Sequence, residues 1–259
     1  MNRDVFCRWA AKVLSPLGFV LHRRYPNHHY VPDYFGAKAH KYKDIRSLEP
    51  FGQLAAAVIS EQRTKLYYDR LFTLYHTLTQ STRTAERSGP FVFCEVGTYR
   101  GGTMKFLCSC CEELKTNYRG IVCDTFEGHD AKDLQPTVTK HKEGDFSDTS
   151  IESVREYLKD YSVQLIKGRI QESLSAFPEN IHFLHLDVDL YEPTAFALAS
   201  FGSRISHGGS IVVDDHGFST CPGVEQAVEE FLQSQIGKAF FYLPLTTGQC
   251  VLVRYGSGA

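Results

Sequence analysis

The stretch FVFCEVGTYRGGT, residues 91–103, reads as an apolar strand, a glycine-rich turn and the beginning of a helix. Further apolar runs and helical stretches alternate after it. The strand-like runs lie at 91–96, 120–124, 163–167, 182–187 and 209–214, and the helical stretches lie at 101–115, 150–159, 193–202 and 222–236. Strands that are apolar throughout and alternate with helices predict a parallel sheet covered on both faces.

The C-terminal stretch has a different pattern. AFFYLPL and QCVLVRY flank TTG, which predicts two antiparallel strands joined by a tight turn at the edge of the sheet. A mostly parallel, Rossmann-like sheet of seven strands that ends in such a hairpin is the topology of class I methyltransferases. We therefore predict this α/β fold, preceded by an N-terminal helical arm.

The turn after the first strand predicts a cofactor site, because ligands of open α/β sheets bind at the carboxyl ends of the strands. Its glycine spacing is G-x-x-x-G-G, so the G-x-G-x-x-G pattern of dinucleotide-binding proteins is not met. Glu95 suits the ammonium group of a methionine moiety, and Asp124 suits two ribose hydroxyls. These features favour S-adenosylmethionine, and an ordinary strand–helix turn is the alternative. The predicted contacts are Glu95, Gly97, Thr98, Tyr99, Gly101, Thr103 and Asp124, with Gly102 opening the helix.

Paired acids end two of the predicted strands, in HLDVDLYEPT (185–194) and SIVVDDHG (210–217). Burying a bare carboxylate is costly unless it is paired or binds a metal. Either these acids lie at solvated strand ends, where they cap a helix or a turn, or a cation collects them.

Several motifs resemble the macrocin O-methyltransferase family. EVGTYRGGT, DTFEG, GDFSDT, LDVDLYEPT, GGSIVVDDHG and PGVEQAVEEF occur in order, and RTKLYYDRLFTLYHTL resembles the family's helix before the first strand. The resemblance runs from about residue 51 to residue 255. It implies S-adenosylmethionine and Mg²⁺ as cofactors, and a sugar hydroxyl, as on macrolide and aminocoumarin antibiotics, as the methyl acceptor. His216 departs from the pattern, because an aromatic residue such as Tyr is expected there.

The same resemblance implies roles for the acids: Asp187, Asp214 and Asp215 as metal ligands and Asp189 as the general base. Neighbouring parallel strands lie about 4.8 Å apart, so their ends can converge on one Mg²⁺, which prefers oxygen ligands. We predict an S-adenosylmethionine- and Mg²⁺-dependent O-methyltransferase of a sugar or glycosylated natural product. The alternatives are a catechol-like small-molecule O-methyltransferase and a non-catalytic partner subunit that binds S-adenosylmethionine.

The chain is predicted to divide at residue 84. Residues 1–84 would form an arm and helices that contact substrate or a second subunit, and residues 85–259 the methyltransferase domain. Aromatic residues without a local core in the first 50 residues predict a homodimer at least. The aromatic residues at 67–75 are predicted to lie in a helix core, and the long charged loop 127–149 is predicted to be a lid.

Composition bounds the partners and the compartment. The formal net charge is −2, which gives no argument for nucleic acid or an anionic membrane. The chain has no apolar run of about 18 residues, so no spanning helix is predicted. Most of the eight cysteines lie in apolar runs, which is typical of buried reduced thiols in a cytoplasmic protein. Cys108 and Cys111 form a C-x-x-C that we predict to be helix core.

Overall fold

The computed structural model describes residues 44–134 and 139–256, and the predicted N-terminal arm lies largely outside this range. The described residues form one seven-stranded sheet with the order β3-β2-β1-β4-β5-β7-β6. The strands are β1 (Phe91–Val96), β2 (Tyr118–Asp124), β3 (Val163–Lys167), β4 (Ile181–Leu186), β5 (Ile205–Val213), β6 (Phe240–Pro244) and β7 (Cys250–Arg254). Strands β1 to β5 pair in parallel, while β7 pairs antiparallel with both β5 and β6. The predicted parallel sheet with a terminal hairpin is confirmed.

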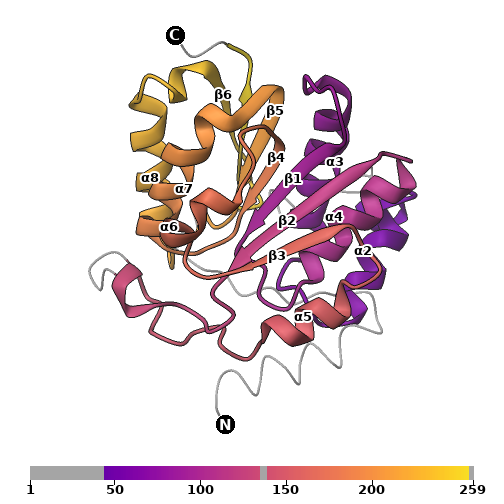
Figure 1. Cartoon of the computed structure of the whole chain (residues 1–259), viewed down its shortest axis with the longest axis horizontal. Coiled ribbons are helices and arrows are strands. Elements are labelled where there is room, and N and C mark those ends of the chain that lie inside the picture. The colour runs from indigo at the N-terminus through magenta and orange to yellow at the C-terminus, as the bar shows by residue number, and fades with distance from the viewer. Residues whose placement is uncertain (1–43, 135–138, 257–259) are drawn as a thin grey trace, which may run out of the picture.

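Helices cover both faces of this sheet (Figure 1). The helices are α2 (Phe51–Ser60), α3 (Tyr68–Thr84), α4 (Gly102–Glu113), α5 (Ile151–Tyr157), α6 (Ile170–Ser173), α7 (Tyr191–Phe201) and α8 (Pro222–Gln233). Short 3₁₀ turns lie at η2 (Ile45–Ser47), η3 (Ala131–Asp133), η4 (Leu174–Ala176), η5 (Gly202–Arg204) and η6 (Gly237–Ala239). The sequence pattern did not predict α6, because a single helical turn is too short to carry a periodic signal.

Two hydrophobic cores flank the sheet because alternate residues of each strand point to opposite faces. Along β1, Phe91 and Phe93 pack with α2 to α5, while Cys94 and Val96 pack with α6 to α8. The seven described cysteines are free and buried, and Cys108 and Cys111 lie inside α4, as predicted. Among the described residues, none of the helices has the length and apolar character needed to cross a membrane.

Helices α2 and α3 share the core of the sheet rather than standing apart from it. Phe51 of α2 and Leu71 and Leu74 of α3 are fully buried in the same cluster as Phe93. The prediction that Tyr67 belongs to the helix core is wrong. Tyr67 precedes α3 with an extended backbone, and 66% of its surface is exposed. The division of the chain at residue 84 stays a prediction.

Candidate active site

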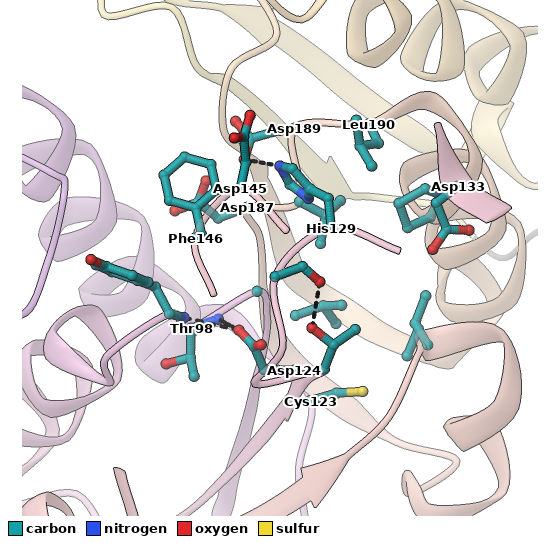
Figure 2. A pocket seen from close by; sticks show the side chains of 18 of the residues that line it. Thr98, Cys123, Asp124, His129, Asp133, Asp145, Phe146, Asp187, Asp189 and Leu190 are labelled. Carbon is teal, nitrogen blue, oxygen red and sulfur yellow. Dashed lines mark hydrogen bonds and ion pairs between the residues drawn. The ribbon is translucent and has the colours of Figure 1, made fainter. Parts of the chain in front are cut away.

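A cavity of about 240 Å³ opens at the carboxyl ends of β1, β2 and β4. The chain leaves β1 and β4 toward opposite faces of the sheet, so the loops that follow them diverge and leave a crevice, as in other open α/β sheets. Figure 2 shows side chains from the turn after β1, the loop 127–149 and the segment after β4 pointing into this space. The predicted residues that line it are Gly97, Thr98, Tyr99, Thr103, Asp124, Asp187, Asp189 and Asp215.

Gly97 allows β1 and β4 to end in close contact. Its φ is +84°, and a Cβ there would lie 1.8 Å from the carbonyl oxygen of Asp187. Gly101 is a predicted cofactor contact, and Gly102 is predicted to open the helix. A Cβ on Gly102 would meet the backbone of Arg63 and Thr64, and one on Gly101 would meet α5. These two glycines therefore make room for the protein's own segments.

Asp124 organises the turn after β1. One carboxylate oxygen accepts hydrogen bonds from the amides of Thr98 (2.7 Å) and Tyr99 (2.9 Å), and the other accepts one from the amide of Phe126 (2.7 Å). Burial raises the pKa of Asp124 above its ordinary value, and these three amides offset part of that rise. The oxygen with a single donor keeps acceptor capacity toward the cavity.

Glu95 lies behind the cavity rather than on its wall. The side chain is fully buried, and its carboxylate accepts a hydrogen bond of 2.5 Å from the Thr98 hydroxyl. Its other oxygen lies 3.0 Å from Nδ1 of His185. The structure therefore gives Glu95 two partners within the protein, and Thr98 stands between it and the cavity.

His185 joins Glu95 to the acid cluster. Its Nε2 is 3.6 Å from Asp214 Oδ2, an ion-pair distance rather than a hydrogen bond. Burial alone would lower the pKa of His185, but the carboxylates of Asp214 and Glu95 raise it to about 10. His185 is thus a buried imidazolium near the carboxyl end of β4, which its apolar neighbours in HFLHLD do not reveal.

Arg70 of α3 is a site residue that the sequence analysis missed. Its guanidinium donates a 3.0 Å hydrogen bond to Asp214 and lies 3.6 Å from Asp215, with 17% of the side chain exposed. The available signal was a cation directly beside Leu71 and Leu74 on the buried stripe of α3. Its pairing with Asp214 and Asp215, which are distant in sequence, could not be predicted from that signal.

The strand-end acids gather around this arginine. Burial alone would raise the pKa of Asp214, but Arg70 and His185 hold it below its ordinary value. Burial and the nearby Asp214 raise the pKa of both Asp187 and Asp215. The negative charges of these neighbouring carboxylates repel one another. A divalent cation bound between them would offset that repulsion, so the acids fit such an ion.

The possible metal donors of this region fall into overlapping groups. In the described part of the chain, donor atoms of Asp187, Asp214 and His185 lie within 4.8 Å of one another, as do those of Asp215, Asp189 and Cys221, and those of His129, His141 and Asp189. The three acids predicted as metal ligands are therefore split between two adjoining groups, with Arg70 bridging Asp214 and Asp215.

Asp189 adopts a left-handed backbone with φ of 59°, which turns its carboxylate toward the loop 127–149. Nε2 of His129 in that loop lies 3.5 Å from Asp189 Oδ2 (Figure 2). Burial alone would raise the pKa of Asp189, but contacts with His129, Asp215 and His141 lower it. The carboxylate is therefore ionised at neutral pH.

The loop 127–149 is tied to the opposite wall of the cavity. Arg169, just before α6, donates a 3.0 Å hydrogen bond to the buried Asp133, and Gln171 donates one of 2.8 Å.

His216, the residue that departs from the family pattern, is buried and lies 3.1 Å from the Tyr242 hydroxyl. Burial lowers the pKa of His216 to about 4, so it packs in the neutral form.

Comparison with known proteins connects this site to a family. The family model described as Macrocin-O-methyltransferase (TylF) matches residues 68–240. A similar protein from Streptomyces olivaceus, 8-demethyl-8-(2,3-dimethoxy-alpha-L-rhamnosyl)-tetracenomycin-C 4'-O-methyltransferase, is 27% identical over 139 residues, which cover 49% of this chain and 53% of that one. Demethyldecarbamoylnovobiocin O-methyltransferase from Streptomyces niveus is 27% identical over 149 residues, covering 53% and 56%. The chain thus spans about half the length of these relatives.

Two solved structures share the fold. The O-methyltransferase NovP superposes with a TM-score of 0.64 at 22% identity, covering 75% of this chain and 83% of NovP. The calicheamicin methyltransferase CalS11 superposes with a TM-score of 0.57 at 18% identity, covering 83% of this chain and 98% of CalS11. The sheet order is therefore that of class I methyltransferases, and the family match covers most of the chain. The chain belongs to the macrocin-O-methyltransferase (TylF) family.

Proposed function

We propose that this protein is an S-adenosylmethionine- and Mg²⁺-dependent O-methyltransferase that acts on a hydroxyl of a sugar or glycosylated natural product. The observation that carries the proposal is that one cavity is lined by residues suited to the cofactor and by residues suited to a metal ion and the acceptor. One wall is the turn after β1 with Asp124, and the other is the acids Asp187, Asp189 and Asp215.

The cofactor side rests on the turn after β1. Asp124 fixes the amides of Thr98 and Tyr99 and retains acceptor capacity for a ribose hydroxyl. Glu95 would act through Thr98, whose hydroxyl it holds, rather than by direct contact with an ammonium group. S-adenosylmethionine, when bound, would supply an electrophilic methyl group.

The acceptor side rests on the acids. Asp187, Asp214 and Asp215 would hold Mg²⁺, with the Arg70 guanidinium giving way at Asp214 or Asp215 to open an oxygen. A bound Mg²⁺ would orient the acceptor and lower the pKa of its hydroxyl. Asp189 would accept the hydroxyl proton, because its low pKa keeps it ionised and the cavity brings it beside Asp187.

The acceptor class rests on the relatives. One is named for a rhamnosyl tetracenomycin and the other for a novobiocin precursor, and both names describe O-methylation. The loop 127–149, whose His129 and Phe146 line the cavity, would close over such an acceptor.

We also propose that the protein acts in the cytoplasm and forms a homodimer through the N-terminal arm. Light scattering on the full chain and on a chain lacking the arm would test the dimer.

A pair of aspartate variants tests the proposed mechanism. Asp187→Asn should weaken Mg²⁺ binding, and added Mg²⁺ should recover part of the activity. Asp189→Asn should lower kcat by roughly 10²–10⁴-fold at saturating Mg²⁺ while leaving cofactor affinity unchanged, because a general base acts only as the proton leaves. The surface variant Asp160→Asn is the control and should behave as wild type.

The assay combines calorimetry with S-adenosylhomocysteine and mass spectrometry of products from rhamnosylated and catechol acceptors. Methylation of catechols alone would replace the sugar by the alternative acceptor class. Cofactor binding without turnover on either class would favour the non-catalytic alternative. Absence of S-adenosylhomocysteine binding would refute the proposal at its base.

A further inference from the structure

A second group of metal donors lies around Asp189, and two of its members, His129 and Asp189, line the same cavity. We call His129, His141, Asp189 and Cys221 the histidine–cysteine cluster. The two histidines come from the loop 127–149, Asp189 from the segment between β4 and α7, and Cys221 from the residue before α8. Three segments that are distant in sequence thus bring these groups around the Asp189 carboxylate: donor atoms of His129, His141 and Asp189 lie within 4.8 Å of one another, and Cys221 Sγ lies beside His141 and Asp189.

The two histidines approach the Asp189 carboxylate without forming good hydrogen bonds to it. His141 Nε2 lies 3.7 Å from Asp189 Oδ1, and His129 Nε2 lies 3.5 Å from Asp189 Oδ2. Both distances exceed the usual range for N–H···O hydrogen bonds. His129 Nε2 is buried and has no hydrogen-bond partner. A buried imidazole nitrogen without a partner is costly, so the spacing calls for an explanation.

The spacing of three of these groups is close to that of one face of a metal-ligand tetrahedron. Cys221 Sγ lies 3.4 Å from His141 Nε2 and 3.6 Å from Asp189 Oδ1, which closes a triangle with the 3.7 Å edge between His141 and Asp189. Zinc bonds of about 2.0–2.3 Å in tetrahedral geometry give ligand–ligand edges of about 3.3–3.8 Å. We propose that the histidine–cysteine cluster is a binding site for Zn²⁺ or a similarly soft divalent cation.

The surroundings support the two histidines as ligands. Asp145 Oδ2 lies 3.6 Å from His141 Nδ1, an ion-pair distance at which the carboxylate would favour the ring orientation that directs Nε2 toward Asp189. Phe146 packs against both imidazoles, with ring centroids 5.4 Å from His129 and 5.9 Å from His141. The apolar ring limits water access on that side of the cluster.

The donor chemistry distinguishes this site from the adjoining Mg²⁺ site, whose proposed ligand Asp215 lies within 4.8 Å of Asp189 and Cys221. Thiolate and imidazole ligands select zinc-like ions, whereas Mg²⁺ selects carboxylates and water. Coordination replaces the proton of the Cys221 thiol, which passes to solvent, and no electron transfer is involved. Zinc here would clamp the loop 127–149 against the sheet. It would also engage the Asp189 carboxylate, so the zinc-bound form is expected to lack the proton acceptor assigned under the proposed function.

Cobalt substitution tests the site without any turnover. Chelator-treated, reduced full-length protein is titrated with Co²⁺ and then with Zn²⁺, while absorbance is recorded. We expect one equivalent of Co²⁺ to give the intense visible bands of tetrahedral cobalt and a near-ultraviolet thiolate-to-cobalt band, and one equivalent of Zn²⁺ to remove both. Cys221→Ser should abolish the thiolate band, and His141→Ala should weaken affinity. Asp145→Asn should weaken Zn²⁺ affinity by about 10–100-fold, the usual effect of losing an outer partner of a ligating histidine.

Two control variants locate the ion. His207→Ala removes a half-exposed histidine elsewhere on the surface and should leave the spectrum unchanged. Asp187→Asn should also keep it, since Asp187 belongs only to the proposed Mg²⁺ site. Circular dichroism verifies that each variant is folded. A weak octahedral spectrum, a thiolate band that survives Cys221→Ser, or loss of the spectrum in Asp187→Asn alone would overturn the zinc site while leaving the proposed methyltransferase function intact.

Discussion

Replacing Gly97 by alanine tests the close approach on which the site depends. The change adds a single methyl group where β1 ends. That methyl would lie 1.8 Å from the Asp187 carbonyl oxygen, whereas real contacts of this kind are essentially never shorter than 3.0 Å. The backbone of Asp187, whose amide donates to the Val96 carbonyl at 2.9 Å, must therefore move by about 1 Å or more.

Gly144 is a matched control for the backbone conformation. Its φ is +78°, close to the +84° of Gly97, but a Cβ there would meet nothing within 4 Å. Gly144→Ala should therefore cost only the left-handed conformation, about 1–2 kcal/mol of unfolding free energy. Gly97→Ala adds the forced separation of two strands, typically about 1–3 kcal/mol more. Gly101→Ala, which meets a flexible Val154 methyl at 3.1 Å with φ of +83°, should fall between them.

Urea unfolding followed by circular dichroism measures these differences, and calorimetry measures the site. Gly97→Ala should weaken both S-adenosylhomocysteine and Mg²⁺ binding, because the turn and Asp187 move together. Gly144→Ala should leave cofactor affinity unchanged. Equal destabilisation by the two substitutions, or wild-type Mg²⁺ affinity in a folded Gly97→Ala protein, would refute the argument that this contact fixes the geometry of the acids.

Three further substitutions probe the charges and the turn. Arg70→Met should lower the unfolding free energy by about 3–5 kcal/mol in chelator, because it leaves the buried carboxylate of Asp214 without its cation. Saturating Mg²⁺ should restore part of that loss. An equal loss with and without Mg²⁺ would argue against a cation at these acids. The pKa of His185 is raised to about 10, so its contribution to stability is fully present below about pH 6.5 and is lost toward pH 10. The melting temperature of wild type should therefore fall more steeply over that window than that of His185→Gln. Parallel pH profiles of the two proteins would contradict the buried imidazolium. Asp124→Ala should weaken S-adenosylhomocysteine binding by about 1–3 kcal/mol in calorimetry, because the amides of Thr98 and Tyr99 lose their acceptor, and unchanged affinity would remove Asp124 from the cofactor site.

The acids of the site could be found from the chain alone because they follow apolar strands. HFLHLD and SIVVDD carry their carboxylates at the ends of β4 and β5, and neighbouring parallel strands bring such ends to one edge. The residues that balance those charges lie elsewhere in the sequence. Arg70 is 144 residues from Asp214, and no local pattern links the two.

The protein partners of Glu95 and Asp124 could not be predicted from the sequence for a related reason. Both were predicted to contact the cofactor because of their positions around the glycine turn. In the fold, Glu95 is taken up by Thr98 and His185, and Asp124 by three backbone amides. A buried carboxylate must find donors, and which donors reach it depends on packing rather than on strand position.

The sequence by itself determined the order of the elements, the parallel sheet with its terminal hairpin and the edge at which the site lies. It could do so because apolar periodicity and glycine turns are local properties of the chain. Only the tertiary structure decided which side chains surround Asp189. His129, His141 and Cys221 approach it because the described parts of the loop, 127–134 and 139–149, return to the sheet edge, where the Lys140 amide donates to the Thr220 carbonyl just before α8. The path of a long loop is set by the contacts it makes at its destination, and its own sequence carries no periodic signal of where that destination is.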